Sequence, residues 1–261
     1  MKKWQIQKPN PEVVRQFMVQ SDLSALSASV LAARNIRTVE EAAAFLCCDG
    51  LSDPFLTADM QEAAQALNEA IDAGTKICVY GDYDCDGVTS TVMLYTHLDA
   101  IGADVQWYIP TREEGYGLNE NAIRKLHDDG TGLIITVDNG VSAVNEAELI
   151  YELGMKLVIT DHHQLPEILP RAEAIVNPHR RDDTSPYKEL AGCGVALKLI
   201  MALERDVDGV LEQYADLAAI GTIGDVVALT GENRIIVKRG LLEMQYSENQ
   251  GLLSLIHEAG L

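Results

Sequence analysis

The sequence has little aromatic and little basic character. Aromatic residues make up 5% of the 261 residues, and 20 Lys and Arg stand against 40 Asp and Glu, a formal net charge of −20. Affinity for nucleic acid comes mainly from Lys and Arg that neutralise phosphates, so this charge excludes a protein that binds nucleic acid over its whole surface. No apolar run approaches the roughly 18 residues of a transmembrane helix. With 47% hydrophobic residues the chain can bury a large core, so we expect a soluble globular protein without a membrane segment.

Cysteine is also scarce and unpatterned. The five cysteines are an odd number without C-x-x-C spacing: Cys47, Cys48, Cys78, Cys85 and Cys193. This pattern excludes a disulfide framework and a cysteine zinc site, and is typical of reduced thiols in a cytosolic protein. The N-terminus, MKKWQIQKPNPEVV, lacks the apolar core and the small-residue cleavage site of a secretory signal. We therefore expect a cytoplasmic location.

Helical patterns fill the first part of the chain. Residues 1–74 are predicted to form a helical N-terminal segment, with helices over 12–18, 23–34, 38–47 and 60–73. Thr38, followed by Glu41 three residues later, fits a capping box at the start of the third helix. Nothing in this segment points to catalysis.

Residues 75–261 are predicted to form one α/β domain. Strands are expected over 76–80, 105–109, 133–137, 156–160 and 173–176. Helices are expected between them over 89–101, 120–129 and 143–153, and after them over 195–204, 209–220 and 233–245. This alternation indicates βαβ units and a mostly parallel sheet covered by helices on both faces. The predicted fold class is α/β, with a helical N-terminal segment and a helical C-terminal part.

An acidic loop directly follows the first expected strand. The run GDYDCDG, from Gly81 to Gly87, places Asp82, Asp84 and Asp86 at alternate positions. Like charges this close are costly unless a cation neutralises them. A calcium loop of EF-hand type would carry Glu at its twelfth position, and this chain has Met93 there. A surface turn without a metal is the other alternative, but the position at a strand's carboxyl end favours a ligand site.

Two further strand ends carry side chains of metal-ligand type. Asp138 follows the third strand in VDNG, and Asp161, His162 and His163 follow the fourth. Taken alone, Asp-Asn-Gly is more often a turn, and paired histidines are weak evidence. The carboxyl ends of parallel strands open at one edge of a sheet, however, so the three groups are expected to converge. Carboxylates with imidazole suit Mn²⁺ or Mg²⁺.

These three motifs together resemble the DHH phosphoesterase family, and specifically its RecJ branch of exonucleases that degrade single-stranded DNA. Further segments carry the resemblance in matching order: DPF at 53–55, YIPTREEGYGL at 108–118, NPH at 177–179, GCGVALKL at 192–199 and IGDVVALTGENR at 223–234. It extends from Trp4 to about Leu255. The wider family usually has a histidine shortly before the paired aspartates, which is missing here; Asp82 as the extra acid is the RecJ pattern. RecJ proteins also continue into a DHH-associated domain and an OB-type domain, which are expected to be absent from this chain.

The resemblance implies a centre of two Mn²⁺ or Mg²⁺ ions. It assigns Asp84 and Asp138 to one ion with support from Asp82, and Asp86, His162 and Asp225 to the second, with Asp138 as the bridge. From the residues alone, Asp225 in IGDVV could equally be the end of a helix.

The resemblance also implies roles at the substrate. His163 is the candidate for a contact to the substrate phosphate or for the proton donor to the leaving 3′-oxygen, and Asp161 would orient an imidazole. Arg112 and the backbone N–H groups of Gly192 and Gly194 are candidate phosphate contacts, although a packing role for these glycines is equally well supported. Cys85 is excluded as a nucleophile because its acidic neighbours suppress the thiolate.

The implied activity is that of a 5′→3′ single-stranded DNA exonuclease that releases 5′-mononucleotides in DNA repair and recombination. Its partners would be single-stranded DNA and a single-strand-binding protein. One alternative is a DHH hydrolase of short oligonucleotides, cyclic dinucleotides or small phosphates, which the RecJ-type segments disfavour. The other is an inactive RecJ-like scaffold, which should have lost ligands, whereas all candidate ligands are present here.

Overall fold

The computed structural model describes residues 7–47 and 50–260, so Trp4 and Cys48 lie outside the described residues. The chain divides into two compact units, residues 1–50 and residues 51–261. This division lies well before the boundary expected after residue 74. The reason is that the helix over Met60–Asp72 buries Met60, Ala63 and Leu67 in the core of the second unit.

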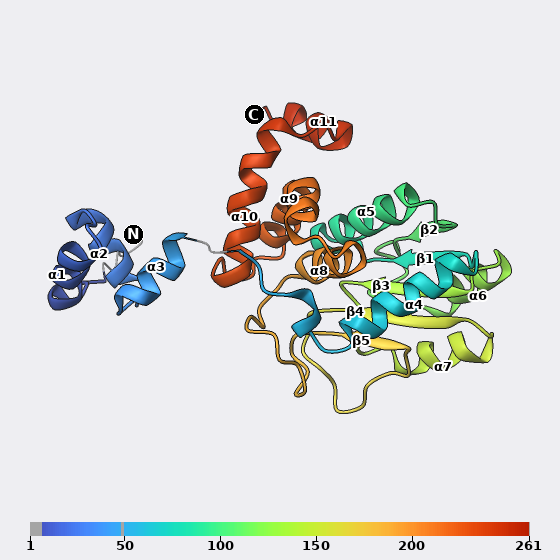
Figure 1. Ribbon diagram of the computed structural model, residues 1–261. Coiled ribbons are helices and arrows are strands. Elements are labelled where there is room, and N and C mark those ends of the chain that lie inside the picture. The colour runs from blue at the N-terminus through green and yellow to red at the C-terminus, as the bar shows by residue number, and fades with distance from the viewer. Residues whose placement is uncertain (1–6, 48–49, 261) are drawn as a thin grey trace. The chain divides into compact units, whose positions relative to one another are not determined.

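The first unit consists of three helices around a small core (Figure 1). They are α1 (Pro11–Gln20), α2 (Ala25–Ala33) and α3 (Val39–Cys47). Phe17, Ala28, Leu31 and Ala42 are buried between them. The expected capping box is confirmed, because Thr38 Oγ1 accepts the Glu41 N–H at 3.1 Å and Glu41 Oε2 accepts the Thr38 N–H at 3.3 Å.

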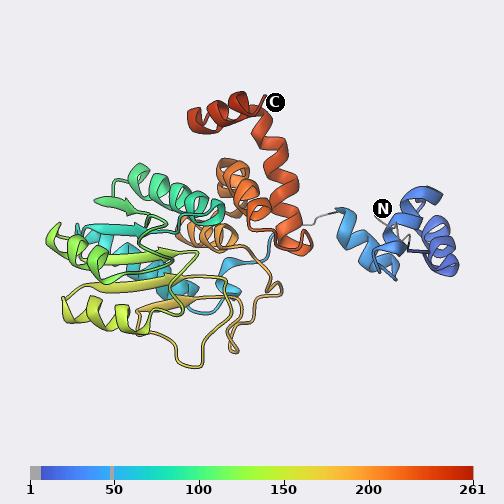
Figure 2. The ribbon, with the colours of Figure 1, turned by 180° about the vertical axis from the view of Figure 1, so that it is seen from behind.

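The second unit alternates strands and helices, as Figures 1 and 2 show from opposite sides. Before the sheet come η1 (Pro54–Leu56) and α4 (Met60–Asp72). The sheet region runs β1 (Ile77–Tyr80), α5 (Cys85–Ala100), β2 (Val105–Tyr108), α6 (Glu120–Asp128), β3 (Leu133–Val137), α7 (Val144–Glu152), β4 (Lys156–Thr160) and β5 (Ala174–Val176). The chain ends with α8 (Gly192–Glu204), α9 (Val207–Gly224), α10 (Gly231–Glu243), η2 (Met244–Tyr246) and α11 (Gln250–Glu258).

The sheet is entirely parallel, with strand order β2-β1-β3-β4-β5. Successive strand residues face opposite sides: Ile77 and Val79 pack with α4, α5 and α8, whereas Cys78 and Tyr80 pack with α6 and α7. Both faces are therefore covered, and this is why the central strands are mostly apolar on both sides. The predicted α/β class is confirmed.

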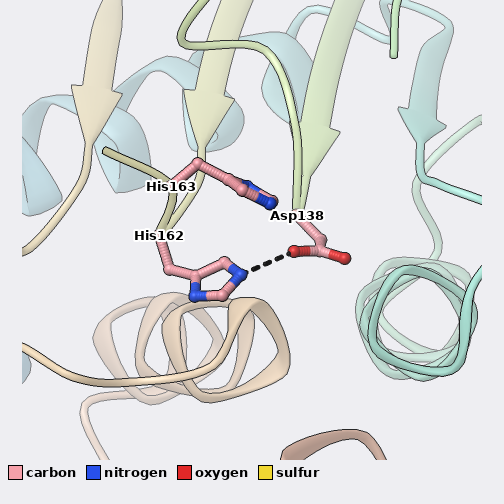
Figure 3. A group of neighbouring side chains, drawn as sticks. All are labelled: Asp138, His162 and His163. Atoms are coloured by element: carbon pink, nitrogen blue, oxygen red, sulfur yellow. Dashed lines mark ion pairs between the residues drawn. The ribbon is translucent and has the colours of Figure 1, made fainter. Parts of the chain in front are cut away.

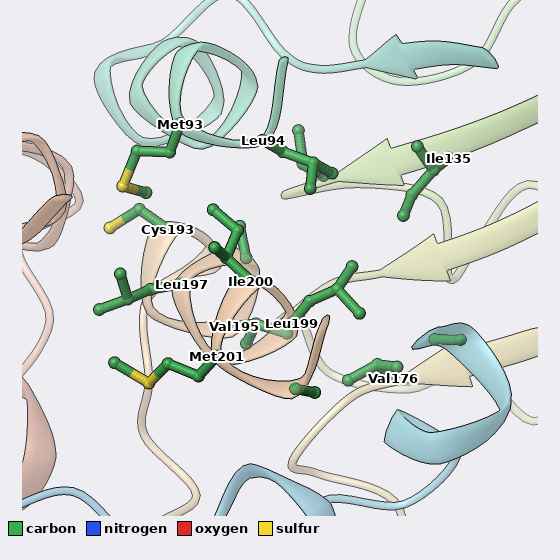
Figure 4. Close-up of a cluster of buried hydrophobic side chains, with 14 of the residues drawn as sticks. Met93, Leu94, Ile135, Val176, Cys193, Val195, Leu197, Leu199, Ile200 and Met201 are labelled. Carbon is green, nitrogen blue, oxygen red and sulfur yellow. The ribbon is translucent and has the colours of Figure 1, made fainter. Parts of the chain in front are cut away.

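Helix α8 is the centre of the larger core (Figure 4). Every residue from Gly192 to Ala202 is buried, and Figure 4 shows Leu199 and Ile200 on the side of the sheet and Leu197 and Met201 away from it. A helix that is apolar on all sides must be enclosed by other elements. Here the sheet, α4, α5 and α9 enclose α8, which fixes the position of its N-terminus.

A buried polar cluster attaches the start of the second unit to this core. Lys198 Nζ lies 2.7 Å from Glu232 Oε2 and donates to Ser52 Oγ at 2.7 Å. The Ser52 hydroxyl in turn donates to Glu232 Oε1 at 2.6 Å. Since Lys198 and Glu232 are both buried, each charge depends on its partner, and this contributes to placing residues 51–53 in the second unit.

Two helices begin at least three residues earlier than the sequence predicts. Helix α5 begins at Cys85 rather than at residue 89, because Asp84 acts as its N-cap and accepts the Gly87 N–H at 2.9 Å. Helix α8 begins at Gly192 rather than at residue 195. The acidic loop is therefore partly a helix start, and Asp86 lies in the first turn of α5.

We expect Gly240→Ala to destabilise the second unit, because α9 and α10 approach closely at this glycine. A Cβ at position 240 would lie 2.0 Å from the Ala215 carbonyl oxygen and 2.5 Å from the Ala219 Cβ. Such overpacking costs roughly 1–3 kcal/mol. Urea unfolding should show this loss, whereas Gly251→Ala on the exposed start of α11 should change stability little. Equal stability of the two variants would contradict the close contact.

Among the described helices, none is both long enough and apolar enough to span a membrane.

Candidate metal centre

The candidate ligands of the sequence meet at the carboxyl ends of the central strands. Asp138 directly follows β3, whereas Asp82 and His162 each come two residues after the end of their strands, β1 and β4. Asp86 enters from the first turn of α5 and Asp225 from the C-cap of α9. The convergence expected of a parallel sheet is thus seen in the structure.

The ligand-type atoms form three groups, one of which, Asp138, His162 and His163, shares a residue with each of the other two. Asp82, Asp84 and Asp138 each offer an oxygen within 4.8 Å of the others, as do the ligand atoms of Asp86, His162 and Asp225. Asp138 Oδ1 lies 3.1 Å from His162 Nε2 and so connects the two groups (Figure 3). Asp138 is therefore placed where a ligand common to both groups must be.

Several of these buried atoms lack a hydrogen-bond partner. Among the described residues, this holds for both carboxylate oxygens of Asp82 and for Asp225 Oδ2, while Asp138 Oδ1 and His162 Nε2 make no hydrogen bond beyond their mutual ion pair. Buried polar atoms are normally paired, and an unpaired one is costly. Because these atoms face one small space and are all oxygen or imidazole nitrogen, the residues present fit bound divalent cations.

The acidic surroundings shift the protonation of the connecting pair. Burial, and then the charges of Asp86 and Asp84, raise the pKa of Asp138 above its usual range. Burial alone would lower the pKa of His162, but the carboxylates of Asp138, Asp86 and Asp225 outweigh it and raise that pKa. An excess of carboxylates in a buried space contributes to both shifts, and cations would relieve the same excess of negative charge.

The N-terminus of α8 holds Asp86 in place. The N–H groups of Gly192 and Cys193 donate to the two carboxylate oxygens of Asp86 at 2.6 and 2.8 Å. A helix N-terminus favours negative charge, so this contact stabilises the buried carboxylate. The Gly192 N–H, expected as a candidate phosphate contact, donates to Asp86 in this structure.

Packing accounts for both glycines of this turn. A Cβ at Gly192 would lie 2.5 Å from Asp138 Oδ1, so only glycine allows α8 to approach the end of β3 this closely. A Cβ at Gly194 would lie 3.0 Å from Leu190 Cδ2. The packing alternative of the sequence is thus what the geometry shows for these two residues.

The backbone of Asp138 has an unusual conformation. Its φ is +62°, in the left-handed region that few residues other than glycine, asparagine and aspartate adopt readily. The Asp138 N–H continues the sheet ladder to the Thr160 carbonyl at 3.1 Å, and Asn139 Nδ2 donates to the Val137 carbonyl at 2.9 Å. These bonds turn the chain sharply at Asp138 and hold its carboxylate over the strand end.

Asp161 orients the neighbouring histidine. Its Oδ1 accepts from the His162 and His163 N–H groups and from His163 Nδ1 at 2.7, 3.0 and 2.7 Å, and its Oδ2 accepts the Val141 N–H at 3.0 Å. Burial would raise the pKa of Asp161, but these donors lower it, and Asp161 in turn raises the pKa of His163. Asp161 is therefore fully paired, while the His163 side chain is 46% exposed toward the open side of the centre.

The remaining predicted residues lie at the rim. Asp225 is the C-cap of α9, as expected if IGDVV ends a helix. Its Oδ2 also lies 3.8 Å from His162 Nε2, so the helix end and the ligand position are compatible. Arg112 is exposed, with its guanidinium 4.8 Å above the Tyr83 ring. Burial first, and then Asp86 and Asp84, raise the pKa of the Cys85 thiol, which confirms its exclusion as a nucleophile.

One residue of the site was missed in the sequence. The Tyr116 hydroxyl donates to the Asp138 carbonyl at 2.8 Å and lies beside the His163 ring. Its only signal was a position within YIPTREEGYGL, where no spacing relates it to a strand end.

Known proteins are similar in sequence to this chain. The model of the DHH family, N-terminal domain, matches residues 76–222. The chain is 45% identical over 262 residues to the single-stranded-DNA-specific exonuclease RecJ of Bacillus subtilis (strain 168), an alignment that covers 99% of this chain and 33% of that protein. It is 34% identical to the RecJ of Escherichia coli (strain K12), which covers 98% of this chain and 47% of that protein. The chain thus spans between a third and a half of the length of these relatives.

A solved structure shares the fold as well. RecJ from Thermus thermophilus in complex with Mn²⁺ matches with a TM-score of 0.79 at 33% identity, over 98% of this chain and 37% of that chain. The resemblance expected from GDYDCDG, VDNG and DHH is confirmed.

Proposed function

We propose, because this chain belongs to the DHH family, that it is the catalytic part of a metal-dependent phosphodiesterase that degrades single-stranded DNA. The reaction would proceed from the 5′ end and release 5′-mononucleotides, in DNA repair and recombination. The observation that carries the proposal is the pair of ligand groups joined at Asp138 and His162. The substrate is supported by the similarity to exonucleases specific for single-stranded DNA.

The residues divide into two ligand sets for Mn²⁺ or Mg²⁺. Asp82, Asp84 and Asp138 would hold one ion, and Asp86, His162 and Asp225 the other, with Asp138 shared. Two such ions supply a hydroxide nucleophile and stabilise both the attacking and the leaving oxygens of an in-line displacement. The chain contributes a rigid frame, since α8 fixes Asp86 and the strand ends fix Asp138 and His162.

The residues on the open side would act on the substrate. His163 faces that side with one nitrogen held by Asp161, so its other nitrogen can contact a phosphate oxygen or protonate the leaving 3′-oxygen. Arg112, whose guanidinium lies 4.8 Å above the Tyr83 ring, would contact a phosphate with its planar guanidinium. We further propose a cytoplasmic location and a single-strand-binding protein as a partner.

The proposal is tested by a nuclease assay on 5′-labelled single-stranded DNA with Mn²⁺. Release of labelled mononucleotide is expected, and chelation should stop it. Dinucleotides and cyclic dinucleotides are assayed in parallel, because preference for them over long strands would identify a hydrolase of small substrates. Mn²⁺ binding without hydrolysis of any of these substrates would identify a scaffold.

The two adjacent histidines should separate metal binding from turnover. His162→Ala should lose one of two Mn²⁺ ions, because Nε2 of His162 lies within the second ligand group. His163→Ala should keep both ions and lower kcat by about 10²- to 10⁴-fold, the range for loss of a general acid or base. Calorimetry with Mn²⁺ and single-turnover kinetics measure the two effects, with His127→Ala on the surface of α6 as control. Equal loss of Mn²⁺ in both variants contradicts this division.

A further inference from the structure

The segment between β2 and α6 forms a braced wall beside the centre. Glu114 accepts hydrogen bonds from the Tyr108 hydroxyl and from Thr111 N–H and Oγ1 at 2.5, 2.7 and 2.9 Å. The Tyr80 hydroxyl, buried under the sheet edge, donates to the Gly117 carbonyl at 3.1 Å. Bonds on both sides of Tyr116 therefore fix the backbone from which its side chain extends.

The Tyr116 side chain contacts two elements of the centre at once. Its hydroxyl donates to the Asp138 carbonyl at 2.8 Å and lies 3.3 Å from each ring nitrogen of His163. The two rings are nearly perpendicular, at 75°, with centroids 5.6 Å apart. Tyr116 is thus in contact with the backbone of the shared ligand and with the ring that faces substrate.

His163 needs such a contact because open space lies beside it. Tyr116, Asp161 and His163 line a hollow of about 540 Å³, together with Gly140–Ala143 and Gln164. The hydrogen bond from His163 Nδ1 to Asp161 fixes one edge of the His163 ring. The His162 ring packs beside it, with 4.5 Å between the two ring centroids. On the side of the hollow, the Tyr116 hydroxyl lies 3.3 Å from both ring nitrogens, where it can restrict rotation of the ring.

We propose that Tyr116 is a positioning residue, which holds the His163 ring in its substrate-facing orientation. The proposal rests on the proposed function for its catalytic consequence. Tyr116 acts through His163 and transfers no proton itself. Loss of its hydroxyl should therefore lower the rate of the chemical step and leave substrate affinity and metal binding unchanged.

The test is Tyr116→Phe, which removes the hydroxyl and keeps the ring. Loss of a residue that orients a catalytic group typically costs about 10- to 100-fold. We expect kcat to fall by about 10-fold on single-stranded DNA, within that range, with KM and Mn²⁺ affinity within about 2-fold of the parent. The control is Tyr151→Phe. Tyr151 lies on α7 and its hydroxyl donates to Glu173, so this variant removes a hydroxyl remote from the centre and should leave kcat unchanged.

A double-mutant cycle shows whether the effect passes through His163. In a His163→Ala background, Tyr116→Phe should lower kcat by less than about 2-fold, because there is no ring left to position. An undiminished effect of about 10-fold in that background overturns the proposal. A rise in KM with unchanged kcat also overturns it, since that result indicates direct contact with substrate.

A measurement without catalysis separates this inference from the proposed function. The chain has six histidines, whose ring signals are recorded in ¹⁵N–¹H spectra of the metal-free protein. The variant His163→Gln identifies the signals of His163. Tyr116→Phe should shift and broaden those signals, and Tyr151→Phe should not. If the parent chain fails to degrade DNA but the shift is seen, positioning stands and the proposed function falls. Unchanged His163 signals refute positioning whatever the activity.

Discussion

Asp138→Asn is expected to lower Mn²⁺-dependent hydrolysis of single-stranded DNA by at least about 10³-fold. Asp138 borders both ligand groups, so replacing its carboxylate with the neutral amide of asparagine should weaken both metal sites at once. A catalytic metal stabilises the transition state by several kcal/mol, and each 1.36 kcal/mol is tenfold in rate, so a loss of about 4 kcal/mol gives this factor.

Asparagine is the right replacement because of the backbone at this position. With φ at +62°, alanine would add strain of roughly 1–2 kcal/mol, whereas asparagine tolerates this region. The fold should therefore persist, and calorimetry should show that neither Mn²⁺ ion binds with the parent affinity. Asp128→Asn, at a side chain 80% exposed on α6, removes the same charge without effect. Unchanged affinity for two Mn²⁺ ions in Asp138→Asn would remove Asp138 from its shared role.

Gly192→Ala is expected to disrupt the centre without changing any ligand. The new Cβ would lie 2.5 Å from Asp138 Oδ1 and 2.7 Å from Asp138 Cβ, so either Asp138 or the start of α8 must move. If α8 moves, Asp86 loses the Gly192 and Cys193 N–H groups as well. A displacement of about 1 Å at a catalytic site can cost about 10²-fold in rate, and overpacking costs roughly 1–3 kcal/mol of stability.

Activity and unfolding should therefore both change in Gly192→Ala. Gly194→Ala is the matched control, two residues along the same buried helix, where the new methyl group meets the flexible end of Leu190. We expect a clear loss of thermal stability and of Mn²⁺ affinity in Gly192→Ala, and smaller losses in Gly194→Ala. The close contact between α8 and β3 would be refuted if the two variants behaved alike.

Much of the sheet could be predicted from local pattern. Strands β3 and β4 begin and end at the predicted residues, because strands of a parallel sheet that is covered on both faces are mostly apolar and are bounded by polar turns. The starts of α5 and α8 were missed. At Asp84 the spacing of three acids indicated a loop, although an N-cap aspartate also begins a helix.

The centre was predictable to the extent that it depends on strand ends. Parallel strands bring their carboxyl ends together, which is why Asp82, Asp138 and His162 could be grouped from sequence. The N–H of Gly192 could not be assigned to Asp86, because that contact depends on how α8 docks in the core. Tyr116 was missed for a similar reason, since its contacts depend on the path of the segment that follows β2.

The bond between the first turn of α8 and Asp86 has a consequence for how the protein opens. Sites formed by surface loops can fluctuate while the rest of a domain stays folded. Here the amides that hold a ligand belong to the most enclosed helix, so they exchange with solvent only when that helix leaves the sheet. We therefore expect the centre to belong to the slowest-exchanging cooperative unit among the described residues, and a variant that loosens the α8 core to make the centre accessible to partial unfolding without any change in its ligands.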